Sequence, residues 1–187
     1  QILRIPENNF LENLTINEYK YVRDSLIEMV LGTDLCFHQK QLKKLQQFAN
    51  IITRQNQLDF QIFTPSDDPI QSIPRIRGVL NEKRFLMEVA LHLSDISNPT
   101  KKLSVSIEWS KRITQEFFDQ GDQEKSLNLP ISPGCDREKN ANMAKQSLAF
   151  IDFIVSPMYN AYYMIDKNID TFIQGIKKTR THWQSQM

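Results

Sequence analysis

The chain contains few of the residues that build disulfide frameworks, tight turns or metal clusters. Its 187 residues include two cysteines, five glycines and three histidines. Cys36 and Cys135 lie far apart and form no C-x-x-C unit, so we expect no disulfide framework and favour a reducing compartment. Because no alternation of apolar and polar residues persists along the chain, the sequence does not predict a β-sheet.

An excess of charge of one sign is also missing. The 23 lysines and arginines balance 22 acidic residues, leaving a formal net charge of +1. That balance indicates neither a nucleic-acid-binding field nor an acidic tail, so we expect no nucleic-acid partner. The basic run at residues 177–180 is more typical of a solvated helix end, because lysine and arginine complement the negative end of the helix dipole.

The longest apolar run is interrupted too often to predict a membrane segment. Residues 147–165 contain the charged Asp152 near their middle, and Pro157 and Asn160 beyond it. A carboxylate there would cost roughly 2.5–3.5 kcal/mol in a bilayer, so we interpret the run as a buried pair of helices. The chain begins with Gln1 and shows no signal peptide, which predicts a cytoplasmic fragment of a longer protein. Membrane attachment through other regions stays open.

Familiar catalytic motifs are absent as well. The three histidines form no H-x-x-x-H or H-E-x-x-H pair. The chain has no G-x-S-x-G motif, no P-loop and no G-x-G-x-x-G motif. Taken alone, the residues therefore predict no complete catalytic constellation.

Helical periodicity, in contrast, runs along most of the chain. Thr15 and Glu18 form a capping box that predicts the start of a helix ending near Gly32. The polar stretch 53–73 has two prolines and predicts a long internal connection. We expect one all-α domain over residues 1–187. The other expected helices are 37–52, 74–97, 103–121, 139–155, 158–167 and 169–183.

The stretch 91–102, LHLSDISNPTKK, places an acid where a helix ends at Asn98-Pro99. The helix dipole opposes a negative charge at that end by roughly 0.3–1 kcal/mol. Asp95 could pair with His92, three residues earlier on the same face, or it could bind a cation. Spacing alone favours the local pair, because a metal site needs more ligands than one carboxylate.

Aromatic side chains gather on neighbouring helical segments in the second half of the chain. Such residues are usually core, but a planar ligand could instead sit between an aromatic face and an aliphatic side chain. The members are Phe117, Phe118, Phe150, Phe153, Tyr159, Tyr162 and Tyr163.

Several segments occur here in the order found in class I cyclic nucleotide phosphodiesterases. They are NNFLENLTINEYKYVRDSLIEMVLGTDL, LHLSDISNPTK, RITQEFFDQGDQEKSLNLPISPGCDR and FIDFIVSPMY. Over nearly its whole length the chain resembles the C-terminal half of that family's catalytic domain. The resemblance implies a compact all-α domain around a two-metal site, with zinc plus magnesium or manganese. It also implies hydrolysis of cyclic AMP or cyclic GMP to the 5′-monophosphate.

The resemblance assigns roles to individual residues. Asp95 corresponds to a direct metal ligand, and Asp34 to an acid near the metal-bound water network. Residues 120–137 resemble a mobile loop that covers the site. The matching substrate-pocket positions are Asn98, Ile113 as one wall of a base clamp, Phe117, and Phe150 as the ring that stacks on the purine.

The chain departs from the family in the glutamine that should precede the stacking phenylalanine by three residues. Ser147 occupies that position, and Gln146 lies one residue earlier. At about 100° per residue the two side chains flank Phe150 on opposite sides. Either the longer Gln146 reaches the purine edge, or Ser147 takes the position with a bridging water. The preference between cyclic AMP and cyclic GMP stays open.

The family's H-N-x-x-H segment and H-D pair, which supply the general acid and the other metal ligands, match nothing in residues 1–90. We therefore expect no catalytic residue in this chain, and one ligand of the about four that a metal site takes from a protein. The isolated chain should be inactive, although the protein it belongs to should hydrolyse cyclic nucleotides. Alternatives are a non-catalytic cyclic-nucleotide-binding protein or a helical scaffold with exposed apolar stripes that forms homo-oligomers.

Overall fold

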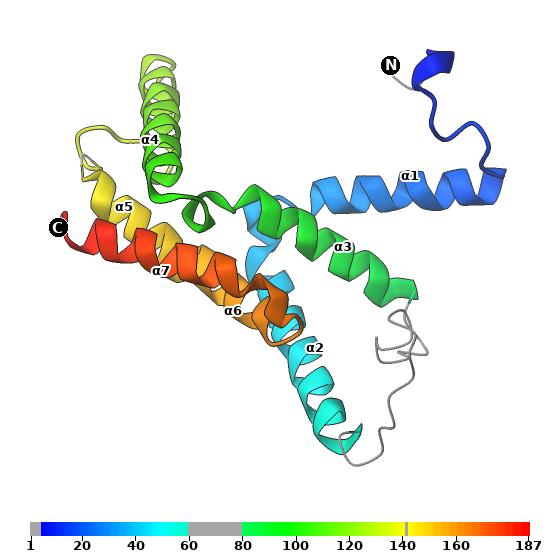
Figure 1. Ribbon diagram of the computed structural model, residues 1–187. Coiled ribbons are helices and arrows are strands. Elements are labelled where there is room, and N and C mark those ends of the chain that lie inside the picture. The colour runs from blue at the N-terminus through cyan, green and yellow to red at the C-terminus, as the bar shows by residue number, and fades with distance from the viewer. Residues whose placement is uncertain (1–4, 60–79, 141) are drawn as a thin grey trace. The chain divides into compact units, whose positions relative to one another are not determined.

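The structure is a computed structural model that describes residues 5–59, 80–140 and 142–187 (Figure 1). Within these ranges every regular element is a helix, so the predicted all-α class is confirmed. The chain divides into two compact units, one formed by residues 1–38 and 66–92, and the other by residues 39–65 and 93–187.

The first unit contains α1 (Ile16–Leu31) and most of α3 (Leu80–Asp95). The predicted capping box is confirmed, because the Thr15 hydroxyl accepts from the Glu18 amide and the Glu18 carboxylate accepts from the Thr15 amide at 2.8 Å. The hydrogen bonds from Thr15 lower the pKa of Glu18. Arg84 of α3 joins the two helices, since it pairs with Glu28 at 3.2 Å and lies 4.5 Å from the centre of the Tyr21 ring.

The apolar side chains of α1 do not form a buried stripe in this structure. Leu26 is 46% exposed and Val30 62% exposed, whereas the buried residue of the helix is Ser25. Periodicity alone predicts the face on which apolar residues gather, but not whether another element covers that face.

A pair of buried histidines lies where α2 (His38–Asp59) begins. The Nδ1 atom of His38 lies 3.0 Å from Nε2 of His92, and both rings are almost fully buried. His92 thus contacts His38 across the fold and not Asp95, which corrects the interpretation that the spacing favoured. One of the two facing nitrogens must carry a hydrogen and the other must accept it.

The second unit begins with the rest of α2, whose buried residues repeat at helical spacing: Leu42, Leu45, Phe48, Ala49 and Ile52. This helix passes its predicted end and takes in residues 53–59, which corrects the start of the predicted connection 53–73. These residues contain neither proline nor glycine, so nothing in them ends a helix. The rest of that connection, and the predicted start of α3 near Pro74, lie outside the described residues.

After α3, the 3₁₀ turn η4 (Asn98–Thr100) leads into α4 (Leu103–Ser126). The helix α4 continues five residues past Gly121, where the sequence predicted its end. Gly121 does not cap the helix. A Cβ at this position would lie 2.8 Å from the carbonyl carbon of Cys135, so the glycine allows close contact with the following loop.

The predicted helix pair over residues 139–167 is one continuous helical run. It consists of α5 (Met143–Phe150), the π-helix η5 (Ile151–Val155) and α6 (Ser156–Tyr163). Pro157 does not break the run, because it lies in the first turn of α6 after a π turn in which Ser156 donates to Ile151. Residues 139, 140 and 142 are not helical; the Asn142 side chain caps α5 by accepting from the Lys145 amide at 2.9 Å.

The last helix, α7 (Asp170–Gln184), follows the 3₁₀ turn η6 (Lys167–Ile169) and matches its predicted bounds within one residue. It packs against α4, α5, α6 and η4, and Figure 1 shows it beside the α5–α6 run. Asp152 of the π-helix receives two hydrogen bonds from Arg180, at 2.7 and 3.1 Å, which raise the pKa of Arg180. Among the described residues, none of the helices has both the length and the apolar character that a membrane crossing requires.

Contacts from α6 and α7 hold the η4 turn and the last turn of α3 in place. The Thr179 hydroxyl donates to the Pro99 carbonyl at 3.0 Å, and the Tyr159 hydroxyl donates to the Leu93 carbonyl at 2.8 Å. Gly175 lies so close to Thr100 that an added Cβ would come within 2.8 Å of the Thr100 carbonyl carbon. Burial raises the pKa of Tyr159 to about 12, so this donor keeps its proton under all physiological conditions.

We expect the buried histidine pair to make stability depend on pH. Burial, and secondly the charge of His92, lower the pKa of His38, so the unfolded chain binds more protons near the ordinary histidine pKa. The contribution of His38 to the free energy of unfolding should be complete above about pH 6.5. It should fall as the pH drops below that value, before carboxylates titrate near about pH 4. Thermal unfolding at about pH 7.5 and about pH 5.5 measures this fall.

The matched variant is His38→Phe, which keeps a ring of similar shape and removes the titrating group. Its thermal midpoint should change less between the two pH values than that of the wild-type chain. An equal fall in both proteins would contradict the prediction.

Candidate functional site

A cavity of about 120 Å³ lies within the second unit, between η4, α4, the α5–η5 run and α7. Apolar groups dominate its surface, and a few polar side chains reach it, as is usual for a site that binds a small molecule. Its lining residues are Asn98, Pro99, Ser110, Ile113, Thr114, Phe117, Gln146, Ser147, Phe150, Ile151, Thr179 and Trp183.

Helix geometry explains which side chains reach the cavity. On α4 the lining residues follow the spacing i, i+3, i+4, i+7, which places them on one face of the helix. They are Ser110, Ile113, Thr114 and Phe117. The same spacing relates Gln146, Ser147 and Phe150 on α5, and Thr179 and Trp183 on α7. Three helices therefore each present one stripe to the same space.

The structure brings together all six residues that the sequence predicted for a substrate pocket. They are Asn98, Ile113, Phe117, Gln146, Ser147 and Phe150, and each lines this cavity. Their role in ligand binding stays a prediction. Four polar or amphipathic lining residues were missed, namely Ser110, Thr114, Thr179 and Trp183. Helical spacing from Ile113 and Phe117 would have identified the first two. The two α7 residues could be identified only from the tertiary structure.

Asp95 is the last residue of α3 and is exposed. It does not line the cavity, and the described residues offer its carboxylate no ion pair. Nor do they bring together three histidine, cysteine, aspartate or glutamate side chains as a metal ion would require. The described residues alone therefore do not fit a metal centre.

Asp34 belongs to the first unit and has a local role there. It caps the 3₁₀ turn η3 (Leu35–Phe37) by accepting a hydrogen bond of 2.9 Å from the Cys36 amide. This bond lowers the pKa of Asp34, so the side chain is ionised at neutral pH. A place in a metal-bound water network stays a prediction.

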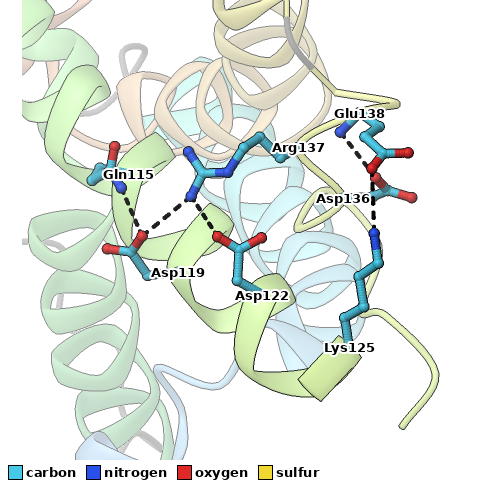
Figure 2. A network of polar contacts seen from close by, with 7 residues as sticks. All are labelled: Gln115, Asp119, Asp122, Lys125, Asp136, Arg137 and Glu138. Carbon is cyan, nitrogen blue, oxygen red and sulfur yellow. Dashed lines mark hydrogen bonds and ion pairs between the residues drawn. The ribbon is translucent and has the colours of Figure 1, made fainter. Parts of the chain in front are cut away.

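Polar contacts attach the segment after α4 to the last turns of that helix (Figure 2). Arg137 donates to Asp122 at 2.7 Å and to Asp119 at 3.3 Å, and its guanidinium lies 4.9 Å from the centre of the Phe118 ring. The bond to Asp122 raises the pKa of Arg137. Lys125 pairs with Glu138 at 3.2 Å. These pairs are exposed, so each is worth at most about 1 kcal/mol.

Two less exposed contacts reinforce this attachment. Glu124 accepts hydrogen bonds of 2.7 Å from both the amide and the hydroxyl of Ser132, and these bonds, the amide's first, lower the pKa of Glu124. The backbone of Cys135 packs directly against Gly121, and the Cys135 thiol is buried.

This arrangement corrects part of the predicted pocket-covering loop 120–137. Residues 120–126 are helical because α4 continues through them. No residue of 120–137 lines the cavity. Asp119 and Asp122 lie more than about 130° around α4 from Phe117, so Arg137 holds the segment on another face of the helix. A covering role for residues 127–137 stays a prediction.

Comparison with known proteins places this chain in a family. The sequence profile described as 3′5′-cyclic nucleotide phosphodiesterase matches residues 1–176, and the chain therefore belongs to that family. The predicted resemblance is confirmed. Members of the family are metal-dependent hydrolases of phosphodiester bonds.

Two curated relatives illustrate the match. The dual specificity calcium/calmodulin-dependent 3′,5′-cyclic nucleotide phosphodiesterase 1 of Drosophila melanogaster is 36% identical over 157 residues, covering 84% of this chain and 16% of the relative. The probable 3′,5′-cyclic-AMP phosphodiesterase pde-4 of Caenorhabditis elegans is 30% identical over 190 residues, covering 100% of this chain and 26% of the relative.

Solved structures agree with the fold. LmjPDEB1 in complex with IBMX superposes with a TM-score of 0.78 at 25% identity, covering 98% of this chain and 48% of that one. The phosphodiesterase domain of the Salpingoeca rosetta rhodopsin phosphodiesterase gives 0.75 at 26% identity, covering 95% and 48%. The chain thus spans about half of these solved domains, and 16% and 26% of the two curated relatives.

The contact between Gly121 and Cys135 predicts how the buried thiol can be exposed. In the Gly121→Ala variant the new methyl group collides with the Cys135 backbone, which must move away from α4. With Cys36 replaced by serine to remove the exposed thiol, labelling of Cys135 by a chromogenic disulfide reagent should be slow and should accelerate about tenfold or more on adding Gly121→Ala.

Lys111→Ala, an exposed substitution elsewhere on α4, is the control and should leave the labelling rate unchanged. Unchanged labelling in the Gly121→Ala variant would show that the Cys135 segment tolerates the methyl group and is not held against α4.

Proposed function

We propose that this chain is the base-binding part of a metal-dependent phosphodiesterase that hydrolyses 3′,5′-cyclic AMP or cyclic GMP to the 5′-monophosphate. The observation that carries this proposal is the cavity itself. Six positions chosen by family resemblance, from three separate segments of sequence, line one mostly apolar space. Family membership supports the reaction class.

The chemistry of the lining suits a flat heterocycle. Phe117 and Phe150 supply aromatic faces, and Ile113 supplies an aliphatic surface from α4. When a purine ring is buried between such surfaces, both of its faces are removed from water and it gains dispersion and stacking energy. Asn98 provides an amide that can meet a polar group of the nucleotide.

The metals proposed for the complete enzyme are zinc together with magnesium or manganese. Asp95, exposed at the end of α3, would contribute one carboxylate. The other ligands and the general acid would come from parts of the whole protein outside this sequence. When bound, two such ions would activate a water molecule and neutralise the phosphate charge. We also propose that Asp34 belongs to the metal-bound water network. The whole protein is proposed to be intracellular and to form homo-oligomers.

A non-catalytic cyclic-nucleotide-binding protein is the second candidate. The observation that favours it is that the described residues form a cavity but contain no cluster of three metal-binding side chains. The two candidates make the same prediction for binding and different predictions for turnover by the whole protein.

Substitution of the stacking ring tests the binding role of the cavity. Phe150→Ala should weaken binding of cyclic AMP and cyclic GMP about tenfold or more, because it removes an aromatic face from a mostly apolar site. Equilibrium dialysis with each nucleotide measures the effect. The control is Phe153→Ala, three residues further along the same helical run, because Phe153 is 71% exposed and does not line the cavity. Equal effects of the two substitutions would contradict the assignment.

We expect the chain by itself to bind nucleotide without hydrolysing it. Asp95 is a single ligand where a metal centre takes about four from the protein. Incubation with cyclic AMP or cyclic GMP and added zinc and magnesium, followed by separation of the 5′-monophosphate, should show no product above the metal-only background. Robust turnover would show that the chain holds a complete catalytic site.

A further inference from the structure

The amide of Gln146 is committed to a contact with the backbone of another segment. Its Nε2 atom lies 3.1 Å from the carbonyl oxygen of Gly134, twelve residues earlier in the chain. A carbonyl oxygen can only accept a hydrogen bond, so the atom facing it must be the NH₂ group. The orientation of the side-chain amide is therefore set by Gly134, although Gln146 also lines the cavity.

The turn around Gly134 (residues 132–135) is attached to α4 on one side and to α5 on the other. Gly134 has a φ of +87°, a conformation that a side chain would strain, and this places its carbonyl toward α5. On the α4 side, Ser132 donates twice to Glu124, and the Cys135 backbone contacts Gly121. The contact from Gln146 is the matching attachment to α5. If Gln146 turned toward a ligand, the turn would lose that attachment.

Ser147 is the neighbouring polar group that stays available to a ligand. It lines the cavity, and the described residues give its hydroxyl no hydrogen-bond partner. A serine hydroxyl rotates and can either donate or accept. Adenine presents an amino donor at position 6, and guanine presents a carbonyl acceptor there. A rotating hydroxyl can meet either group, whereas an amide with a fixed orientation favours one of them.

We propose that Gln146 is a positioning residue that holds the Gly134 turn against α5, and that the Ser147 hydroxyl meets the edge of the bound base. The second half of this proposal rests on the proposed function. It follows that the cavity takes adenine and guanine nucleotides with similar affinity.

Hydrogen exchange of the whole chain tests the role of Gln146 without any ligand. Gln146→Ala should raise exchange of the Ser132, Gly134 and Cys135 amides about two- to tenfold, the effect of losing one hydrogen bond. Gln146→Glu should raise it at least as much, because a carboxylate cannot donate to the Gly134 carbonyl. Gln146→Lys restores a donor of similar reach and should restore protection. Unchanged exchange in Gln146→Ala, or no rescue by lysine, would overturn the positioning role.

The matched control for exchange is Ser147→Ala, which should leave residues 132–135 as protected as in the wild-type chain. An equal rise in this variant would also overturn the role of Gln146, because it would show that any change in this turn of α5 loosens the segment.

Equilibrium dialysis with cyclic AMP and cyclic GMP tests the base edge. The wild-type dissociation constants should agree within about tenfold, Ser147→Ala should weaken both, and Gln146→Ala should leave their ratio unchanged. A change of that ratio by about tenfold in Gln146→Ala would assign base recognition to Gln146 and overturn the proposal. If neither nucleotide binds the wild-type chain, the proposed function fails together with the role of Ser147, while hydrogen exchange still decides the role of Gln146.

Discussion

The close contact between α7 and the Asn98–Thr100 turn is the constraint on which the cavity depends. The lack of a side chain at Gly175 allows the helix to meet the backbone at Thr100, and Thr179 donates to the Pro99 carbonyl one turn later. Because the turn joins α3 to α4, holding it fixes both where α3 ends and the direction in which α4 leaves. The exposed Asp95 and the cavity face of α4 are therefore positioned by the same contact.

The helix α4 carries two different surfaces, and this explains its length. One face presents Ile113 and Phe117 to the cavity, while Asp119 and Asp122 on another face bind Arg137. The ion pairs are exposed and individually weak. What makes the attachment specific is the combination of the Glu124–Ser132 hydrogen bonds with the close approach at Gly121. Because α4 continues past Gly121 to Ser126, Glu124 lies on the helix when it bonds Ser132.

Features that depend on residues close together in the sequence could be predicted. The Thr15–Glu18 capping box is a contact between residues three apart, so it follows from sequence. The bounds of α7 follow from periodicity, and the α4 residues of the cavity follow from helical spacing. The predictions that were wrong concern features that depend on residues far away in the sequence. The helix predicted to end at residue 121 continues to Ser126, and only the position of Cys135 shows what the glycine at 121 allows.

Sequence by itself determined the all-helical class, the capping of α1, the family and the six candidate pocket positions, because each depends on residue order or on spacing along a helix. Tertiary structure decided which partner each polar side chain takes. His92 lies three residues from Asp95 and contacts His38, 54 residues away, and the Gln146 amide turns to Gly134. A hydrogen bond is made by whichever group the packed backbone brings within about 3 Å, and separation along the sequence does not determine that distance.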